Sequence, residues 1–174
     1  MTDPQESAAC EVAHGHGSDP AADRTLVAAF VSPVADYLLR YASDAGFRVL
    51  LVEPDPALAE DARATGYPVV ADAADHLDDT ADVVVTDHHR PELGIVLRDA
   101  LASKARWVGI MGNPRHPAPH VPALTDLGVA DADIDRVHRP IGLNIGSRTP
   151  AEIAIATLAG LIADRNARPG GFSF

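Results

Sequence analysis

The sequence predicts a single α/β domain, with helices on both faces of a doubly wound, mainly parallel β-sheet. Short runs of β-type residues alternate with amphipathic segments from Leu26 onward, which is the pattern of a parallel sheet covered by helices. A length of 174 residues, of which 47% are hydrophobic, is enough for the core of one domain and hardly of two. We therefore expect a flexible tail over residues 1–24, a domain over 25–168 and a C-terminal tail over 169–174.

Six runs have the composition of β-strands. They are residues 26–31, 48–53, 68–71, 82–87, 106–111 and 137–143. Between the first and second runs, apolar residues recur at helical spacing, and Gly46 is placed to end that helix. Between the second and third runs, a helix is expected to begin at Asp55 and Pro56 and to close at Gly66.

The chain between the fourth and sixth runs is less regular. Leucine and alanine share one helical face over residues 93–101, which predicts a third helix. Residues 113–121 are crowded with proline and histidine and are expected to form a loop. A short helical patch near residues 124–127 follows this loop.

The last helix has a well-defined start in the sequence. Thr149 can cap it, Pro150 suits its first position, and Glu152 completes a capping box. Its expected apolar face consists of Ala154, Ile155, Leu158, Ala159, Leu161 and Ile162. Its expected polar face consists of Glu152, Thr157, Gly160 and Asp164. We expect this helix to pack its apolar face against the rest of the domain.

Charge and composition argue against several classes of function. A formal net charge of −11 argues against binding to nucleic acid, which needs clustered lysine and arginine. No apolar run approaches the roughly 20 residues that span a bilayer, and the N-terminus does not resemble a signal peptide, so we expect a cytoplasmic protein. A single cysteine, Cys10, excludes a disulfide framework. Cys10, His14 and His16 do not make a closed metal site, so no metal is expected.

In a sheet of this kind, ligands bind at the carboxyl ends of the strands. A dinucleotide-binding protein carries G-x-G-x-x-G after the first strand, whereas residues Phe30 to Ala35 contain no glycine. Pro33 also removes an N–H group from the helix start, so NAD(P) or FAD is not expected to bind in the ordinary pose. Glu53 lies where an acid would accept hydrogen bonds from a ribose, but we favour a solvent-facing charge before Pro54.

Candidate ligand-binding residues follow the fourth and fifth strands. His88 could perform acid/base chemistry or bind a metal, although a surface position is the favoured interpretation. Gly112, Asn113 and Arg115 form a glycine-framed turn with a basic end. Arginine is suited to forked contacts with phosphate or carboxylate groups.

The segment before the last helix combines glycines with polar side chains. Its candidate binding residues are Asn144, Gly146, Ser147, Arg148 and Thr149. Free N–H groups at a helix start favour an anion, on which Arg115 and Arg148 could converge. In the alternative interpretation, the glycines only shape the turn and Arg148 is a solvated surface charge. No motif of a catalytic nucleophile, a P-loop lysine or a carboxylate pair occurs, so no catalytic residue is expected.

Two motifs in the last third resemble the C-terminal Rossmann domain of the XdhC/CoxI family. They are the run from Trp107 to Arg115 and the run from Val137 to Ala154, in the family's order and spacing. The family's Gly-Ser-Arg turn corresponds to Gly112, Asn113 and, after Pro114, Arg115. Its Gly-Leu-Asp-Ile-Gly run corresponds to residues 142–146. The family's glycine-rich first loop is replaced here, and a stand-alone domain without the family's N-terminal domain is expected.

This resemblance implies an accessory factor for a molybdenum hydroxylase of the xanthine dehydrogenase or carbon monoxide dehydrogenase type. Such factors bind the molybdenum cofactor, as molybdopterin or its cytosine dinucleotide, and hand it to the apoenzyme. The implied partners are the apoenzyme or other maturation factors, and a homodimer is an additional expectation. Two alternatives remain: a non-catalytic interaction module with a degenerate nucleotide site, and an NAD(P)-dependent oxidoreductase, which the first loop disfavours.

Overall fold

The structure, a computed structural model, describes residues 23–113 and 115–171. Most of the expected N-terminal tail, with Cys10, His14 and His16, lies outside the described residues. Within the described ranges, no helix is long and apolar enough to cross a membrane.

The core is a five-stranded parallel β-sheet with the strand order β3-β2-β1-β4-β5. Its strands are β1 (Thr25–Ala29), β2 (Arg48–Val52), β3 (Val69–Val70), β4 (Ala81–Val85) and β5 (Trp107–Ile110). The helices are α2 (Pro33–Asp44), α3 (Pro56–Arg63), the 3₁₀ helix η1 (Ala74–His76), α4 (Leu93–Ala102), α5 (His120–Thr125), α6 (Asp131–Ile134) and α7 (Pro150–Arg165). The predicted doubly wound α/β class is confirmed.

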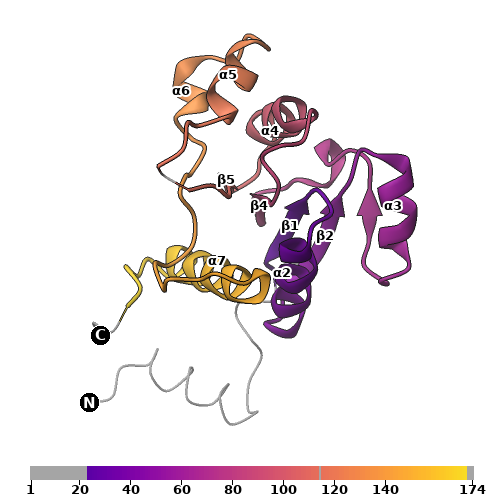
Figure 1. Ribbon diagram of the computed structural model, residues 1–174, viewed down its shortest axis with the longest axis vertical. Coiled ribbons are helices and arrows are strands. Elements are labelled where there is room, and N and C mark those ends of the chain that lie inside the picture. The colour runs from indigo at the N-terminus through magenta and orange to yellow at the C-terminus, as the bar shows by residue number, and fades with distance from the viewer. Residues whose placement is uncertain (1–22, 114, 172–174) are drawn as a thin grey trace.

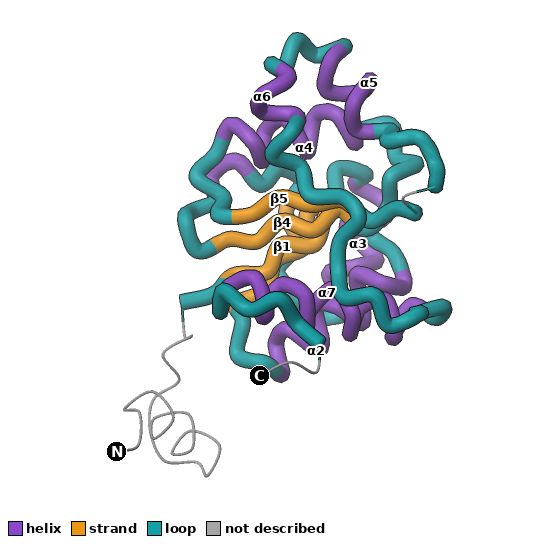
Figure 2. The backbone as a smooth tube through the Cα atoms, turned by 90° about the vertical axis from the view of Figure 1, so that its left-hand side faces the viewer, coloured by secondary structure: helices purple, strands orange, loops and turns teal. Residues whose placement is uncertain are grey.

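Helices cover both faces of the sheet. In Figure 1 and Figure 2, α2 and α7 lie on one face, whereas α4, α5 and α6 lie on the other. Each face has its own buried cluster of aliphatic side chains, and the strands contribute to both because successive residues point to opposite sides. Leu38 and Leu158 belong to the first cluster, and Leu97 and Leu124 belong to the second.

Helix starts follow the capping signals in the sequence. Ser32 accepts a hydrogen bond from the Ala35 N–H group at the start of α2, and Asp55 caps α3 in the same way. The capping box of α7 forms as predicted between Thr149 and Glu152. These caps fix where the chain leaves the carboxyl edge of the sheet.

The buried face of α7 differs from the predicted face. Ile155 is 50% exposed, whereas Thr157, assigned to the polar face, is 2% exposed. The reason is that α7 is covered from two directions, by α2 and by the segment that precedes it. Gly142 of this segment lies so close to α7 that an added Cβ would come within 3.0 Å of the Ala156 carbonyl carbon.

The predicted sixth strand over residues 137–143 is wrong. Only His138 pairs with the sheet, through a single parallel bridge to Gly109 of β5. Pro140 has no N–H group to donate, and Gly142 has a φ of +83°, outside the extended region. The Leu143 N–H group donates instead to the Ala156 carbonyl oxygen, at 3.0 Å, so the segment continues along α7.

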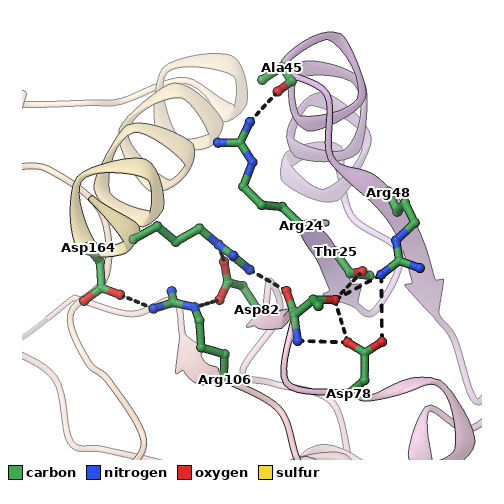
Figure 3. Close-up of polar contacts among 10 residues, drawn as sticks. Arg24, Thr25, Ala45, Arg48, Asp78, Asp82, Arg106 and Asp164 are labelled. Carbon is green, nitrogen blue, oxygen red and sulfur yellow. Dashed lines mark hydrogen bonds and ion pairs between the residues drawn. The ribbon is translucent and has the colours of Figure 1, made fainter. Parts of the chain in front are cut away.

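A buried carboxylate connects the C-terminal end of α7 to the amino end of β4 (Figure 3). Asp82 of β4 is fully buried and accepts hydrogen bonds from Arg106 Nε at 2.7 Å and Arg165 Nε at 2.6 Å. Arg165 also donates to the Thr80 carbonyl oxygen, and Arg106 reaches Asp164 at 2.7 Å. One carboxylate therefore links β4, the start of β5 and the last turn of α7.

Replacement of Asp82 by alanine should lower the free energy of unfolding by about 3 kcal/mol, because it leaves the largely buried Arg165 and the more exposed Arg106 without their buried anion. Asp164→Ala is the matched control, since it removes only the more exposed partner of Arg106 and should cost about 0.5 kcal/mol or less. Urea unfolding at neutral pH measures both values. Equal losses for the two variants would contradict the assigned role of Asp82.

Candidate functional site

The carboxyl ends of the central strands meet at one edge of the sheet. In the parallel register, Ala29 of β1 is level with Val52 of β2 and Val85 of β4. The residues that follow these strands, including Glu53 and Thr86, are therefore neighbours. This edge is where a doubly wound sheet binds its ligands.

Glu53 and Arg90 form an ion pair at the carboxyl ends of the central strands. Arg90 Nη2 lies 2.8 Å from Glu53 Oε1, and Arg90 Nη1 lies 3.0 Å from Oε2. The same carboxylate accepts hydrogen bonds from the N–H groups of Val31, at 2.8 Å, and Asp55, at 2.9 Å. Glu53 is fully buried, so the favoured sequence interpretation, a solvent-facing charge, is wrong. Both carboxylate oxygens are used, and a ribose would have to displace one of these donors.

The first strand-to-helix turn is also engaged by the chain itself. Phe30 has a positive φ of 75° where dinucleotide-binding proteins use glycine, and its buried ring lies 4.9 Å from the Arg90 guanidinium carbon. The Ser32 hydroxyl donates to Thr86 Oγ1 at 2.9 Å, and Thr86 in turn donates to the Ala29 and Phe30 carbonyl oxygens. Side chains of this chain therefore make contacts within the turn at which a dinucleotide-binding domain holds its pyrophosphate.

The hydrogen-bond donors around Glu53 stabilise the ionised form of its carboxyl group. Burial alone would raise the pKa of this carboxyl, but Arg90 and the N–H groups of Val31 and Asp55 lower it below its ordinary value. A carboxyl group with a lowered pKa in the folded state stabilises the fold above its ordinary pKa, and this contribution disappears as the pH falls through the lowered pKa. The Glu53–Arg90 pair should therefore weaken under acidic conditions.

For Glu53→Gln, we expect the free energy of unfolding at pH 7 to fall by about 3 kcal/mol, because Arg90 loses its buried anion. The difference from the wild type should shrink as the pH is lowered, since the wild-type carboxyl then becomes protonated. Urea titrations over the acidic range measure this trend. Glu60→Gln, which alters an exposed pair on α3, should show no such convergence, and a constant gap for Glu53→Gln would refute the interpretation.

The segment after β4 presents a histidine pair at this edge. Asp87 Oδ1 accepts a hydrogen bond from the His89 N–H group at 2.9 Å, and the rings of His88 and His89 lie 4.1 Å apart. His88 is half-buried, contacts the backbone of Met111 after β5, and has a pKa lowered by burial and by the charges of His89 and Arg139. The imidazole of His88 is therefore largely neutral at pH 7. Among the described residues, no group of three or more potential ligands could hold a metal ion.

The loop after β5 is organised by Arg139, which the sequence analysis did not select. Arg139 Nη2 donates to the carbonyl oxygens of Asn113, His116 and Pro117. Gly112 admits this side chain, because an added Cβ would lie 2.8 Å from Arg139 Nε. The available signal was a proline-rich loop with few N–H donors and unpaired carbonyl groups, but a sequence does not show which arginine faces it.

Arg115 is exposed at the same loop. Its N–H group donates to Asn113 Oδ1 at 2.9 Å, whereas its guanidinium group has no hydrogen bond or ion pair with any described residue. Gly112 therefore makes room for an arginine of the chain itself, and Arg115 is the side chain of this turn that remains open to solvent.

The start of α7 is already neutralised. Glu152 Oε2 accepts hydrogen bonds from the N–H groups of Arg148, at 2.8 Å, and Thr149, at 3.0 Å, while Thr149 Oγ1 accepts one from the Glu152 N–H group. The N–H groups of Arg148, Thr149 and Glu152 are therefore engaged by the chain's own side chains, so only part of the expected free donors is left for an external anion. The backbone donations at Arg148 and Thr149 hold the pKa of Glu152 below its ordinary value.

The other candidates before α7 are open to solvent to different degrees. Asn144, Gly146 and Arg148 are exposed, and Ser147 is half-buried. The Arg148 guanidinium group has no partner among the described residues, and an added Cβ at Gly146 would meet nothing within 4 Å. Convergence of Arg115 and Arg148 on one anion stays a prediction.

Gly142 and Gly146 provide a matched pair of substitutions. Gly142→Ala should lower the free energy of unfolding by about 3 kcal/mol, because a positive φ is combined with close contact to α7. Gly146→Ala has a comparable φ of +70° but open space, so only the backbone cost of about 1 kcal/mol is expected. Thermal or urea unfolding compares them. Equal losses would mean that the contact between the loop and α7 contributes nothing.

The strand order and the edge site define a Rossmann-type α/β domain whose first turn is closed by its own ion pair. The family model described as the XdhC Rossmann domain matches residues 26–161. The chain therefore belongs to the XdhC family through this domain, and the resemblance found in the sequence is confirmed.

Two relatives place the domain in larger proteins. The chain is 32% identical over 108 residues to the uncharacterized protein YqeB of Escherichia coli K12, a match that covers 62% of this chain and 19% of YqeB. A crystal structure from Bacillus halodurans, described as a xanthine dehydrogenase, shares the fold with a TM-score of 0.65 at 22% identity. That match covers 83% of this chain and 45% of the Bacillus chain. The chain thus spans less than half of either relative.

Proposed function

We propose that this domain acts in the cytoplasm as an accessory factor in the maturation of a molybdenum hydroxylase, where it binds the molybdenum cofactor and passes it to the apoenzyme. Membership of the XdhC family carries this proposal. The Bacillus protein that shares the fold is described as a xanthine dehydrogenase, which agrees with a client of that type. The ligand is molybdopterin or its cytosine dinucleotide form, both of which carry phosphate.

An anionic group fits the loops after β5 and before α7 better than it fits the turn after β1. Above β1, the Val31 N–H group donates to the buried Glu53 carboxylate and is therefore not available to a phosphate, which disfavours the NAD(P)-dependent oxidoreductase alternative. Next to the loops after β5 and before α7, Arg115 and Arg148 have exposed guanidinium groups without partners among the described residues. Open space above Gly146 lets a ligand approach the backbone.

In this function, the protein positions a ligand and performs no bond chemistry. The arginine side chains bind the anionic part of the cofactor, while the contact of Gly142 with α7 fixes the loop that carries Arg148. When bound, the cofactor supplies redox chemistry that belongs to the client enzyme. The apoenzyme, another maturation factor or a second copy of this chain is the proposed partner.

An interaction module remains the second candidate, because large apolar side chains are exposed in the last third of the chain. Ile145, before α7, is 53% exposed and Ile155, on α7, is 50% exposed. Such residues favour contact with another protein surface. This candidate needs no cofactor binding, so a ligand titration separates the two.

Titration of the purified chain with molybdopterin should show saturable binding, followed by calorimetry or fluorescence. Arg115→Ala and Arg148→Ala should each weaken binding about tenfold, because a charge-assisted hydrogen bond contributes on the order of 1.5 kcal/mol. Arg63→Ala, an exposed arginine of α3 paired with Glu60, is the control and should leave the affinity unchanged. No binding, or equal losses in all three variants, would reject the proposed role and favour the interaction module.

A further inference from the structure

Arg139 is held in a fixed orientation by the loop after β5. Its Nη2 atom lies 2.8 Å from the Asn113 carbonyl oxygen, 3.1 Å from that of His116 and 3.3 Å from that of Pro117. The Nε atom is buried over Gly112 without a hydrogen-bond partner. Because two sides of the guanidinium group are covered in this way, the group cannot rotate without breaking the loop.

The charge of Arg139 lacks a counter-ion in the described part of the chain. None of the ion pairs among residues 23–113 and 115–171 includes it, although the whole chain carries a net charge of −11. Carbonyl oxygens supply only partial negative charge. The Nη1 atom has no hydrogen-bond partner among these residues and, unlike Nε, is not buried. One edge of a pre-oriented cation is thus left open.

Two histidines lie within the field of this cation. His120 is buried, its Nδ1 atom has no partner, and its pKa is lowered by burial and by Arg139. His88 lies in the segment after β4 and contacts the Met111 backbone, and the charge of Arg139 contributes to lowering its pKa. The charged or titratable groups that act on His88 are Asp87, His89 and Arg139. Arg139 is the permanent cation among them, and because no carboxylate among the described residues pairs with it, its charge favours a bound anion.

We propose that Arg139 Nη1 and the imidazole of His88 form an anion subsite between the carboxyl ends of β4 and β5, which binds a phosphate group. The two N–H bonds of Nη1 donate to two oxygens of a tetrahedral oxyanion, and the imidazole, which takes up a proton when the anion binds, donates to a third. The identity of the natural ligand rests on the proposed function, which makes it the phosphate group of the cofactor. Free inorganic phosphate has the same chemistry and is the other candidate ligand of the subsite.

The primary test follows the imidazole resonances of the whole chain by NMR while the pH is varied in inorganic phosphate or in chloride of equal ionic strength. Phosphate should raise the pKa of His88 by about one unit, because a bound dianion offsets the charge of Arg139. The resonance is assigned by its loss in His88→Gln. Identical His88 titrations in phosphate and chloride would overturn the subsite.

Variants separate the bound anion from general effects of salt. Arg139→Gln should abolish the phosphate response, and Gly112→Ala should do the same because its Cβ displaces the guanidinium group. His88→Gln leaves the contacts of Arg139 with the loop intact but removes the reporting resonance, so its affinity for inorganic phosphate is measured by calorimetry and should be about tenfold weaker than that of the wild type. This measurement stands even if the Arg139 variant loosens the loop. Arg98→Gln on α4, paired with Asp99, should change nothing. A phosphate response that survives in Arg139→Gln would refute the assignment.

Two further measurements distinguish a phosphate ester from free phosphate as the ligand, and the anion subsite from the proposed cofactor function. Phenyl phosphate should bind more tightly than inorganic phosphate if the natural ligand is an ester, and less tightly if it is the free ion. A phosphate response that depends on Arg139, without any molybdopterin binding, would leave the subsite standing and reject the cofactor function. Molybdopterin binding that is unchanged in both Arg139→Gln and His88→Gln would reject the subsite and leave the cofactor function standing.

Discussion

The ion pair between Glu53 and Arg90 is the contact on which the arrangement of the carboxyl end of the sheet depends. It joins the end of β2, the turn after β1, the start of α3 and the segment after β4 in one buried network. In a dinucleotide-binding domain the same place holds a ligand phosphate on free N–H groups. Here a carboxylate of the chain accepts a hydrogen bond from one of those N–H groups, that of Val31, so the fold holds an anion of its own at this place.

The sequence was sufficient for the parts of the fold that depend on local signals. Strand composition and the caps at Asp55 and Thr149 act within a few residues, and the structure has these elements nearly where they were expected. The expected strand over 137–143 failed because its apolar residues serve a different partner. Close contact between Gly142 and Gly160 draws the segment onto α7, and periodicity does not reveal which surface an apolar run will cover.

The candidate site was harder to predict because its charges pair over long distances in the chain. Glu53 and Arg90 are separated by 37 residues, and Arg139 reaches carbonyl groups that are 22 to 26 residues away. Neither contact leaves a motif. The same limitation applies to the start of α7, where the sequence correctly indicated a capping box but not its consequence, that Glu152 occupies the N–H groups an external anion would need.

The distribution of arginine partners suggests how an acidic chain can still select an anion. Arg90, Arg106 and Arg165 are neutralised by buried carboxylates, so they hold the fold together and add little to the field outside. Arg115, Arg139 and Arg148 form no ion pair with any described residue, although carboxylates are in excess in the chain. In the proposed sites, an arginine without a carboxylate partner would attract a small anion, while a chain with a net charge of −11 would repel an extended polyanion. This is the physical reason to test a phosphorylated cofactor rather than nucleic acid.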